Sequence, residues 1–212
     1  MDWILANTGR IAELTLDHAA LSLPAVLAAF LLSAPLAVLA NRLRPLREPI
    51  VSGTGLLYAV PSLPLFIVLP IILGTGIRDP LNAVAALTLF GMALMVRSAA
   101  EALDAVSAEV RLAAAAQGYS SWGRFWTVDL PLAGPAMLAG LRVVSVSTIS
   151  LATVSAVLGV PSLGSLFTDG FQRGIMESVL AGVVMTVVMA LILDLLLVLS
   201  GRLLMPWARR RA

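Results

Sequence analysis

The sequence contains no cysteine and no lysine, and it has a single histidine. The absence of cysteine excludes disulfide bonds, thiolate nucleophiles and cysteine-ligated metals. No glycine-rich phosphate-binding loop of the P-loop type is present, so ATP hydrolysis, if the protein depends on it, has to take place on another chain. With one histidine and few carboxylates, the sequence shows no converging set of titratable residues of the kind that catalysis or metal binding requires, and we predict neither a catalytic nor a metal site.

Charged residues are also scarce, at 12% of the chain, whereas hydrophobic residues make up 59% and the mean hydropathy is +0.98. Soluble globular domains are about a quarter charged and about half apolar. This composition predicts an all-α, polytopic membrane protein that is embedded in the lipid bilayer. The formal net charge of +2 is too small, on so apolar a chain, to suggest nucleic-acid binding.

Five apolar runs are long enough to cross about 30 Å of hydrocarbon. We predict spans at residues 20–40, 55–74, 82–100, 134–160 and 178–200. Three prolines in the second run predict a kinked or broken helix: Pro61, Pro64 and Pro70.

The segments outside the spans are short. Residues 41–49 have the composition of a basic, proline-containing turn, and residues 161–177 that of a polar connection. Residues 1–17 are an external or interfacial segment, for which a short interfacial helix and a partly ordered tail are both open. Residues 18–204 form one transmembrane domain, and residues 205–212 form a basic tail.

Arginine is distributed unequally between the two sides that five spans define. One side holds Arg10, Arg78 and Arg173, and the other holds ten arginines, among them Arg42, Arg111 and three in the tail. The positive-inside rule therefore predicts an external N-terminus and a cytoplasmic C-terminus. The loop at residues 101–132 is then cytoplasmic.

This loop is unusual for a hydrophilic connection. It contains an alanine-rich helical segment, a break at Gly118, a group of aromatic residues and a final Leu130-Pro131. A surface helix on lipid usually has a basic polar face, but residues 113–123 carry no charge. The pattern therefore favours a helix that docks into a groove of a partner protein.

Two ionisable residues in or near the spans need an explanation. His18 is expected to have an interfacial or capping role, because an imidazole is well accommodated at headgroup depth. Asp194 lies inside the fifth span, where a carboxylate is costly and indicates a functional site by default. We favour a structural pair with Arg97 or Arg142, or a position near the cytoplasmic headgroups.

The fourth span has a middle section rich in small hydroxylated residues. These side chains could line a polar path, or they could allow close helix packing, and both interpretations are open. The candidates for a path are Ser147, Ser150 and Thr153 in this span, with Pro61 and Ser62 in the second span.

The loop resembles the Glu-Ala-Ala loop of binding-protein-dependent ABC importer permeases of the type I fold. Ala113-Ala114, Gly118 and Leu130-Pro131 occupy the family positions with the Gly-to-Pro interval intact, and Leu112 stands where the family has Glu. Three further stretches are similar to the osmoprotectant branch, which transports glycine betaine, choline, carnitine or proline. They are residues 18–22, residues 59–63 and residues 141–164.

The resemblance implies a permease that works by alternating access with a second permease subunit, two ABC ATPase subunits and an external solute-binding protein. No cofactor is expected on this chain, since ATP and Mg²⁺ would bind the ATPase subunits. The residues that would contact the ATPase are Ala113, Ala114, Gly118, Tyr119, Ser120, Trp122 and Phe125. A methionine or other amino-acid importer is the alternative, and a stand-alone secondary carrier fits less well because no inverted repeat is visible.

Overall fold

The structure, a computed structural model, describes the backbone of residues 2–211 and the side chains of residues 2–208. Residue 1 of the predicted N-terminal segment therefore lies outside the described residues. In the predicted C-terminal tail, the side chains of residues 209–211 and all of residue 212 lie outside them. All regular elements of the described backbone are helical. They are α1 (Asp2–Ala6), α2 (Thr8–Arg42), α3 (Arg44–Leu57), α4 (Ser62–Leu73), α5 (Pro80–Asp104), α6 (Ala108–Ala116), α7 (Ser121–Arg124), η1 (Phe125–Asp129), α8 (Leu130–Ala152), η2 (Thr153–Leu158), α9 (Gly164–Arg173), α10 (Met176–Leu204) and η3 (Pro206–Arg211).

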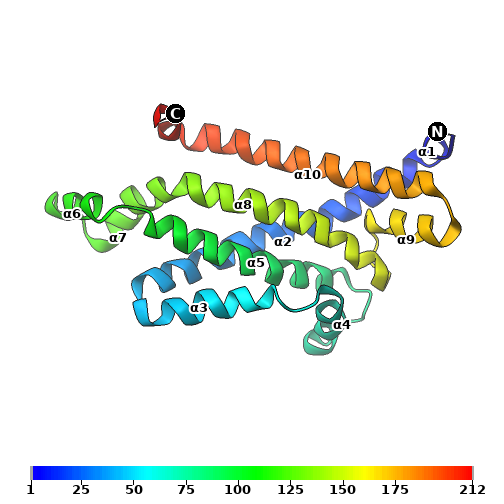
Figure 1. Ribbon diagram of the computed structural model, residues 1–212, viewed down its shortest axis with the longest axis horizontal. Coiled ribbons are helices and arrows are strands. Elements are labelled where there is room, and N and C mark those ends of the chain that lie inside the picture. The colour runs from blue at the N-terminus through cyan, green and yellow to red at the C-terminus, as the bar shows by residue number, and fades with distance from the viewer. Residues whose placement is uncertain (1, 212) are drawn as a thin grey trace.

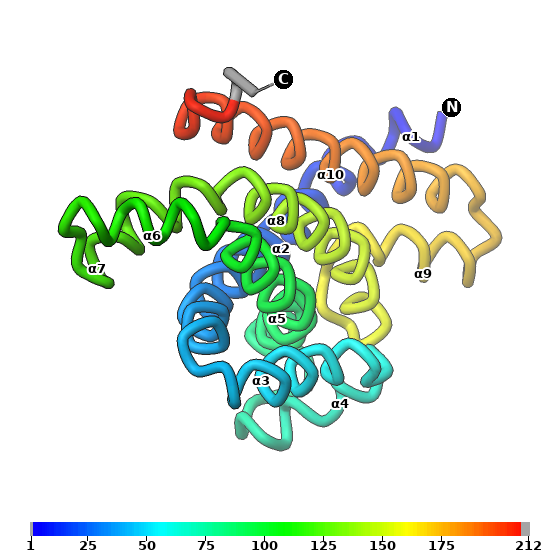
Figure 2. Tube along the Cα trace, turned by 60° about the vertical axis from the view of Figure 1, so that its left-hand side comes forward, coloured from blue at the N-terminus to red at the C-terminus, as the bar shows by residue number. Residues whose placement is uncertain are grey.

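The long helices run roughly along the long axis of the molecule, with α5 at their centre. In both views α5 and α8 lie between α10 on one side and α3 and α4 on the other (Figures 1 and 2). Of the most apolar stretch of α5, 61% of residues are buried, against 6% for α10. Helix α5 is therefore the core of the bundle, whereas α10 leaves a broad apolar surface uncovered, as a helix facing lipid would.

Small residues allow the central helices to approach closely. A Cβ added at Gly91 of α5 would lie 2.7 Å from Ala29 Cβ of α2, and one at Gly140 of α8 would lie 2.6 Å from Ser98 Cβ. Packing of this kind replaces the hydrophobic driving force, which is weak between helices in a membrane.

The structure agrees with five predicted spans if the broken helix pair α3 and α4 is counted as one span. Four helices are long and apolar enough to cross a membrane, and α3 and α4 form a bent pair with a 102° angle between them. The predicted break of the second run is confirmed: α3 ends at Leu57 and α4 begins after Pro61, whose ring fixes φ at −59°.

The predicted turn at residues 41–49 is confirmed in place but is shorter than predicted. Helix α2 ends at Arg42, the chain breaks at Leu43, and residues 44–49 belong to α3. Pro45 did not prevent this helix, because a proline in the first turn has no intrahelical N–H bond to lose.

The segment at residues 1–17, expected to be external or interfacial, is helical in its described part. Asp2–Ala6 form the short helix α1, and residues 8–17 are the first turns of the 35-residue helix α2. Ile11 and Leu14 are buried in a cluster with Leu163, Leu166 and Ala181, so one face of this stretch packs against the bundle, while Glu13 and Leu16 are exposed. Its position relative to the membrane stays a prediction. Likewise, the predicted polar connection at residues 161–177 contains helix α9.

The two ends of the bundle differ. The N-terminus and α9 lie at one end, and the C-terminus, α6 and α7 lie at the other (Figure 1). Chain termini at opposite ends agree with an odd number of crossings.

Candidate functional site

Helix α6 and the turn that follows it are defined by local capping. The Ser107 hydroxyl accepts a bond from Val110 N at the start of α6 (3.4 Å). At the end, Gly118 N donates to Ala115 O (3.0 Å) and Tyr119 N donates to Ala114 O (3.2 Å). This pair of bonds is a Schellman motif, which needs a left-handed residue, and Gly118 has φ +85°. The predicted break at Gly118 is confirmed.

The chain turns back into α7, where Ser120 accepts a bond from Gly123 N (3.1 Å). Three aromatic rings then form one cluster. Trp122 and Phe125 are stacked with centroids 6.3 Å apart, and Trp126 meets their edges at 5.6 and 5.2 Å. The Arg42 guanidinium, from the end of α2, lies 5.6 Å from the centre of the Trp122 ring, so the cluster is held against the bundle by a cation–π contact.

We call residues 107–129 the coupling segment. Five of the seven predicted contact residues are exposed on it: Ala113, Gly118, Tyr119, Ser120 and Trp122. Ala114 is buried and Phe125 is partly buried against the core, and the contact role of the whole set stays a prediction. Two exposed residues of the segment were not in the predicted set, Leu112 at 70% and Trp126 at 51%.

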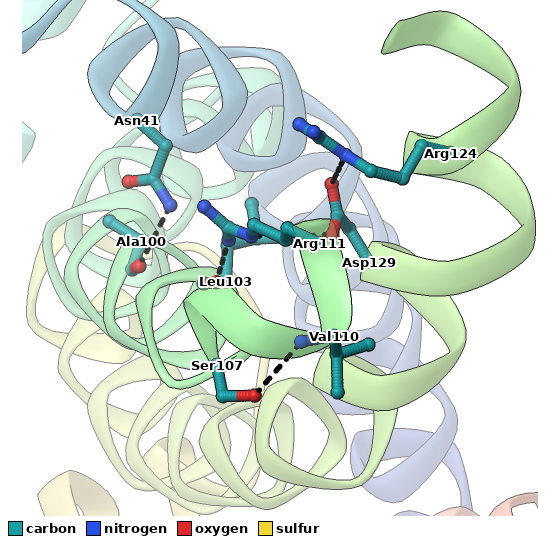
Figure 3. A network of polar contacts seen from close by, with 8 residues as sticks. All are labelled: Asn41, Ala100, Leu103, Ser107, Val110, Arg111, Arg124 and Asp129. Atoms are coloured by element: carbon teal, nitrogen blue, oxygen red, sulfur yellow. Dashed lines mark hydrogen bonds and ion pairs between the residues drawn. The ribbon is translucent and has the colours of Figure 1, made fainter. Parts of the chain in front are cut away.

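A polar network at the base of the coupling segment was also missed. The buried carboxylate of Asp129 lies between Arg111 of α6 (3.4 Å) and Arg124 of α7 (3.3 Å) (Figure 3). The only signal in the sequence was an acidic residue directly before Leu130-Pro131, which has no obvious partner in a linear reading.

A cavity of about 700 Å³ lies between the broken helix pair, α5 and α8. All five residues predicted for a path line it: Pro61, Ser62, Ser147, Ser150 and Thr153. The structure therefore brings together two segments that are about 90 positions apart in the sequence. An aromatic pair, Tyr58 and Phe90, also lines the cavity, with ring centroids 6.1 Å apart.

The hydroxylated residues of the fourth span divide between two faces. Ser145 and Ser155 are fully buried and bond backbone carbonyls of their own helical turns, at Leu141 (2.8 Å) and Ala152 (2.8 Å). The three path candidates of this span face the cavity instead. The buried hydroxyl groups fit the packing interpretation, and a solute path along the cavity stays a prediction.

His18 has no exposed surface, so the interfacial role predicted for it is wrong, but it does act as a cap. Its Nε2 lies 2.9 Å from Ile149 O of α8, and its Nδ1 accepts a bond from Leu163 N at the start of α9 (3.3 Å). Because Nδ1 accepts, the ring is the neutral tautomer that carries its proton on Nε2.

The carboxylate of Asp194 is paired with Arg142, one of the two partners considered from the sequence. Arg142 Nε and Nη2 donate to Asp194 Oδ1 (2.6 Å) and Oδ2 (2.8 Å), a bidentate arrangement between α8 and α10. The pair gives the outermost helix a specific attachment to the bundle.

Helices of membrane length that enclose a cavity with hydroxyl-bearing walls, and that present a capped helical segment at one end, have the architecture of a transporter's transmembrane domain. Residues 29–210 match the family model described as "Binding-protein-dependent transport system inner membrane component", and the chain belongs to this family. It is a permease subunit of an ABC importer, embedded in the inner membrane.

Relatives and solved structures agree with this assignment. The chain is 34% identical over 171 residues to the osmoprotectant import permease protein OsmW of Salmonella typhimurium, covering 79% of each chain. It is 24% identical to the glycine betaine/carnitine/choline permease OpuCB of Bacillus subtilis, covering 77% of this chain and 74% of that one. A structure of the MetNI methionine ABC transporter has the same fold, with a TM-score of 0.74, 19% identity and coverage of 92% and 94%.

Proposed function

We propose that this permease translocates a compatible solute of the glycine betaine, choline, carnitine or proline type. The support for this substrate class is the similarity to osmoprotectant and glycine betaine/carnitine/choline permeases over more than three quarters of the chain. The aromatic pair Tyr58 and Phe90 in the cavity wall adds π faces, which attract quaternary ammonium groups.

The proposed assembly contains a second permease subunit, two ABC ATPase subunits that bind ATP and Mg²⁺, and an external solute-binding protein. In the proposed orientation the end with α6 and α7 is cytoplasmic, which the excess of arginine at that end supports. The solute-binding protein would then meet the end that carries α9.

The single observation that carries the transport mechanism is the coupling segment itself. Its charge-free residues Ala113, Tyr119 and Trp122 are exposed, and α6 and α7 lie at the end of the bundle where an ATPase would dock (Figure 1). ATP binding would move this segment and reorient the helices around the cavity. To shift such a two-state equilibrium almost completely, ATP must favour one state by roughly 5.5 kcal/mol.

Gly118→Asp tests the docking assignment. A Cβ at Gly118 would meet nothing within 4 Å, so the new side chain clashes with no neighbour, although φ +85° strains any residue other than glycine there. We expect normal membrane insertion, loss of ATPase co-purification and loss of solute uptake. Gly74→Asp is the matched control, because Gly74 also has a positive φ (+67°) and open surroundings but lies far from the coupling segment. Normal uptake by Gly118→Asp would refute the docking assignment.

Cysteine scanning tests the path assignment, and the natural chain contributes no background labelling. We expect Ser147→Cys and Ser150→Cys to react with a small hydrophilic thiol reagent and labelling to inhibit uptake, because both side chains line the cavity. Ser145→Cys, on the same helix but fully buried, should stay unlabelled. Equal labelling at all three positions would contradict the assignment.

The substrate class is best tested on the cognate solute-binding protein. We expect calorimetry to detect binding of glycine betaine or a related solute. Binding of methionine, with no response to quaternary ammonium solutes, would favour the amino-acid importer instead.

A further inference from the structure

The base of the coupling segment contains one carboxylate and two guanidinium groups. Asp129 is 6% exposed; its Oδ1 lies 3.4 Å from Arg111 Nε and its Oδ2 lies 3.3 Å from Arg124 Nε. Arg111 belongs to α6, Arg124 to α7, and Asp129 directly precedes α8 (Figure 3). One side chain thus joins both short helices to the start of a span.

Arg111 extends this connection to α5. Its Nη2 donates to Leu103 O (2.6 Å), a carbonyl in the last turn of α5. Leu103 O also accepts a turn bond from Val106 N (3.4 Å), and carbonyls at a helix C-terminus attract cations, so the guanidinium adds a favourable contact. Next to it, Asn41 at the end of α2 donates to Ala100 O of α5 (3.2 Å). The coupling segment is therefore attached to the spans that precede and follow it in the chain.

Asp129 is central to this network because its carboxylate balances the positive charges of both arginines. Arg111 and Arg124 each form an ion pair with this one carboxylate. Without it, two cations would face each other across a cavity of about 450 Å³ that Arg42 also lines. Removing the buried carboxylate is unfavourable, because the two guanidinium groups, each about 30% exposed, would repel each other without a compensating charge.

We propose that Asp129 is a positioning residue that makes the coupling segment move as one body with α5 and α8. The inference rests on the proposed function, in which the segment docks an ATPase. It assigns to Asp129 the transmission of movement rather than the docking, because the carboxylate is buried beneath the surface that a partner would meet.

Asp129→Asn tests this in the complete transporter, reconstituted in lipid with its ATPase and solute-binding protein. The variant keeps the size of the side chain and removes its charge. We expect the ATPase to co-purify at the wild-type ratio and basal ATP hydrolysis to stay within about twofold. Stimulation of hydrolysis by the loaded solute-binding protein, and solute uptake per ATP, should fall at least tenfold. Asp129→Glu should recover part of the coupling.

Asp104→Asn is the matched control. It removes the carboxylate of another ion pair at the same end of the bundle, Asp104 with Arg47 (2.6 Å). The Asp104 side chain is about half exposed, and both residues lie outside the coupling segment. This variant should couple as wild type does. If Asp129→Asn fails to accumulate, Arg124→Gln replaces it; this variant leaves the Arg111 contact in place and should reduce coupling to an intermediate level.

The outcomes separate the two proposals. Wild-type coupling by Asp129→Asn or its replacement, equal loss by Asp104→Asn, or loss of ATPase co-purification from Asp129→Asn would each overturn the positioning role. Failure of the proposed function would appear differently, as a wild-type permease that binds no ATPase.

Discussion

The replacement His18→Phe isolates the hydrogen-bonding role of the buried histidine. Helix α8 tightens near its end, and Thr153 N bonds Ser150 O instead of continuing the regular pattern to Ile149 O. His18 Nε2 takes up that carbonyl (2.9 Å), and Nδ1 takes up the N–H of Leu163 at the start of α9 (3.3 Å). Both backbone groups are located where helices begin or end, so they have no regular partner.

The size of the effect follows from these two groups. A phenyl ring fills the space of the imidazole but makes neither bond. Each buried group left without a partner costs about 1–3 kcal/mol, or about 2–6 kcal/mol for the pair. For a domain of this size, about 1 kcal/mol lowers the midpoint of thermal unfolding by roughly 2–4 °C, so we expect a decrease of roughly 5–20 °C.

The assay is thermal unfolding of the purified chain in detergent micelles, followed by circular dichroism. Ser22→Ala is the control: Ser22 is equally buried and one turn further along α2, but it bonds only a carbonyl of its own helix, His18 O (2.8 Å). Its loss should cost at most about 1 kcal/mol. His18→Gln, which keeps a donor and an acceptor, should fall between the two. A midpoint for His18→Phe equal to that of Ser22→Ala would refute the reasoning.

Two further predictions concern packing and charge. Gly164→Ala should prevent stable accumulation of the protein, because the added Cβ would lie 1.9 Å from Thr153 O, a backbone atom that cannot rotate away. Normal expression and uptake of this variant would contradict the described contact between η2 and α9. Asp194→Asn should destabilise the chain in thermal unfolding more than the double variant Arg142→Gln/Asp194→Asn does, because the single change leaves a cation without its partner in an apolar setting. Equal or larger destabilisation by the double variant would show that the pair contributes little.

The sequence was sufficient to predict an all-helical membrane fold with up to five candidate spans, since apolar runs of membrane length with at most one charge are rarely stable as helices in water. It was less informative about helix ends. Residues 8–17 mix charged and apolar positions, and Ile11 and Leu14 turn out to be buried by α9 and α10, which lie about 150 residues away in the chain. Local composition cannot distinguish such a buried stripe from an interfacial helix.

The candidate site was predictable where it depends on local chemistry. The end of α6 at Gly118 follows from the conformational freedom of glycine, and the break before Pro61 follows from its missing N–H. The contacts of His18 were not predictable, because they span 131 and 145 positions and are made to backbone atoms, which leave no signature in the identity of the partner residue.

A carboxylate in the coupling segment could have two roles: it could contact a partner on the outer surface, or it could attach the segment to the bundle. Leu112 occupies the position where the resemblance predicts Glu, and it is 70% exposed on the outer surface of α6. A leucine there cannot form an ion pair with a partner, so the proposed docking would depend on apolar contact and shape at this position. The carboxylate of Asp129 lies on the inner side of the segment, at 6% exposure, where it pairs with Arg111 and Arg124. A missing carboxylate on the outer surface is therefore compatible with the proposed mechanical connection, because the proposed docking and the proposed connection rest on different residues of the segment.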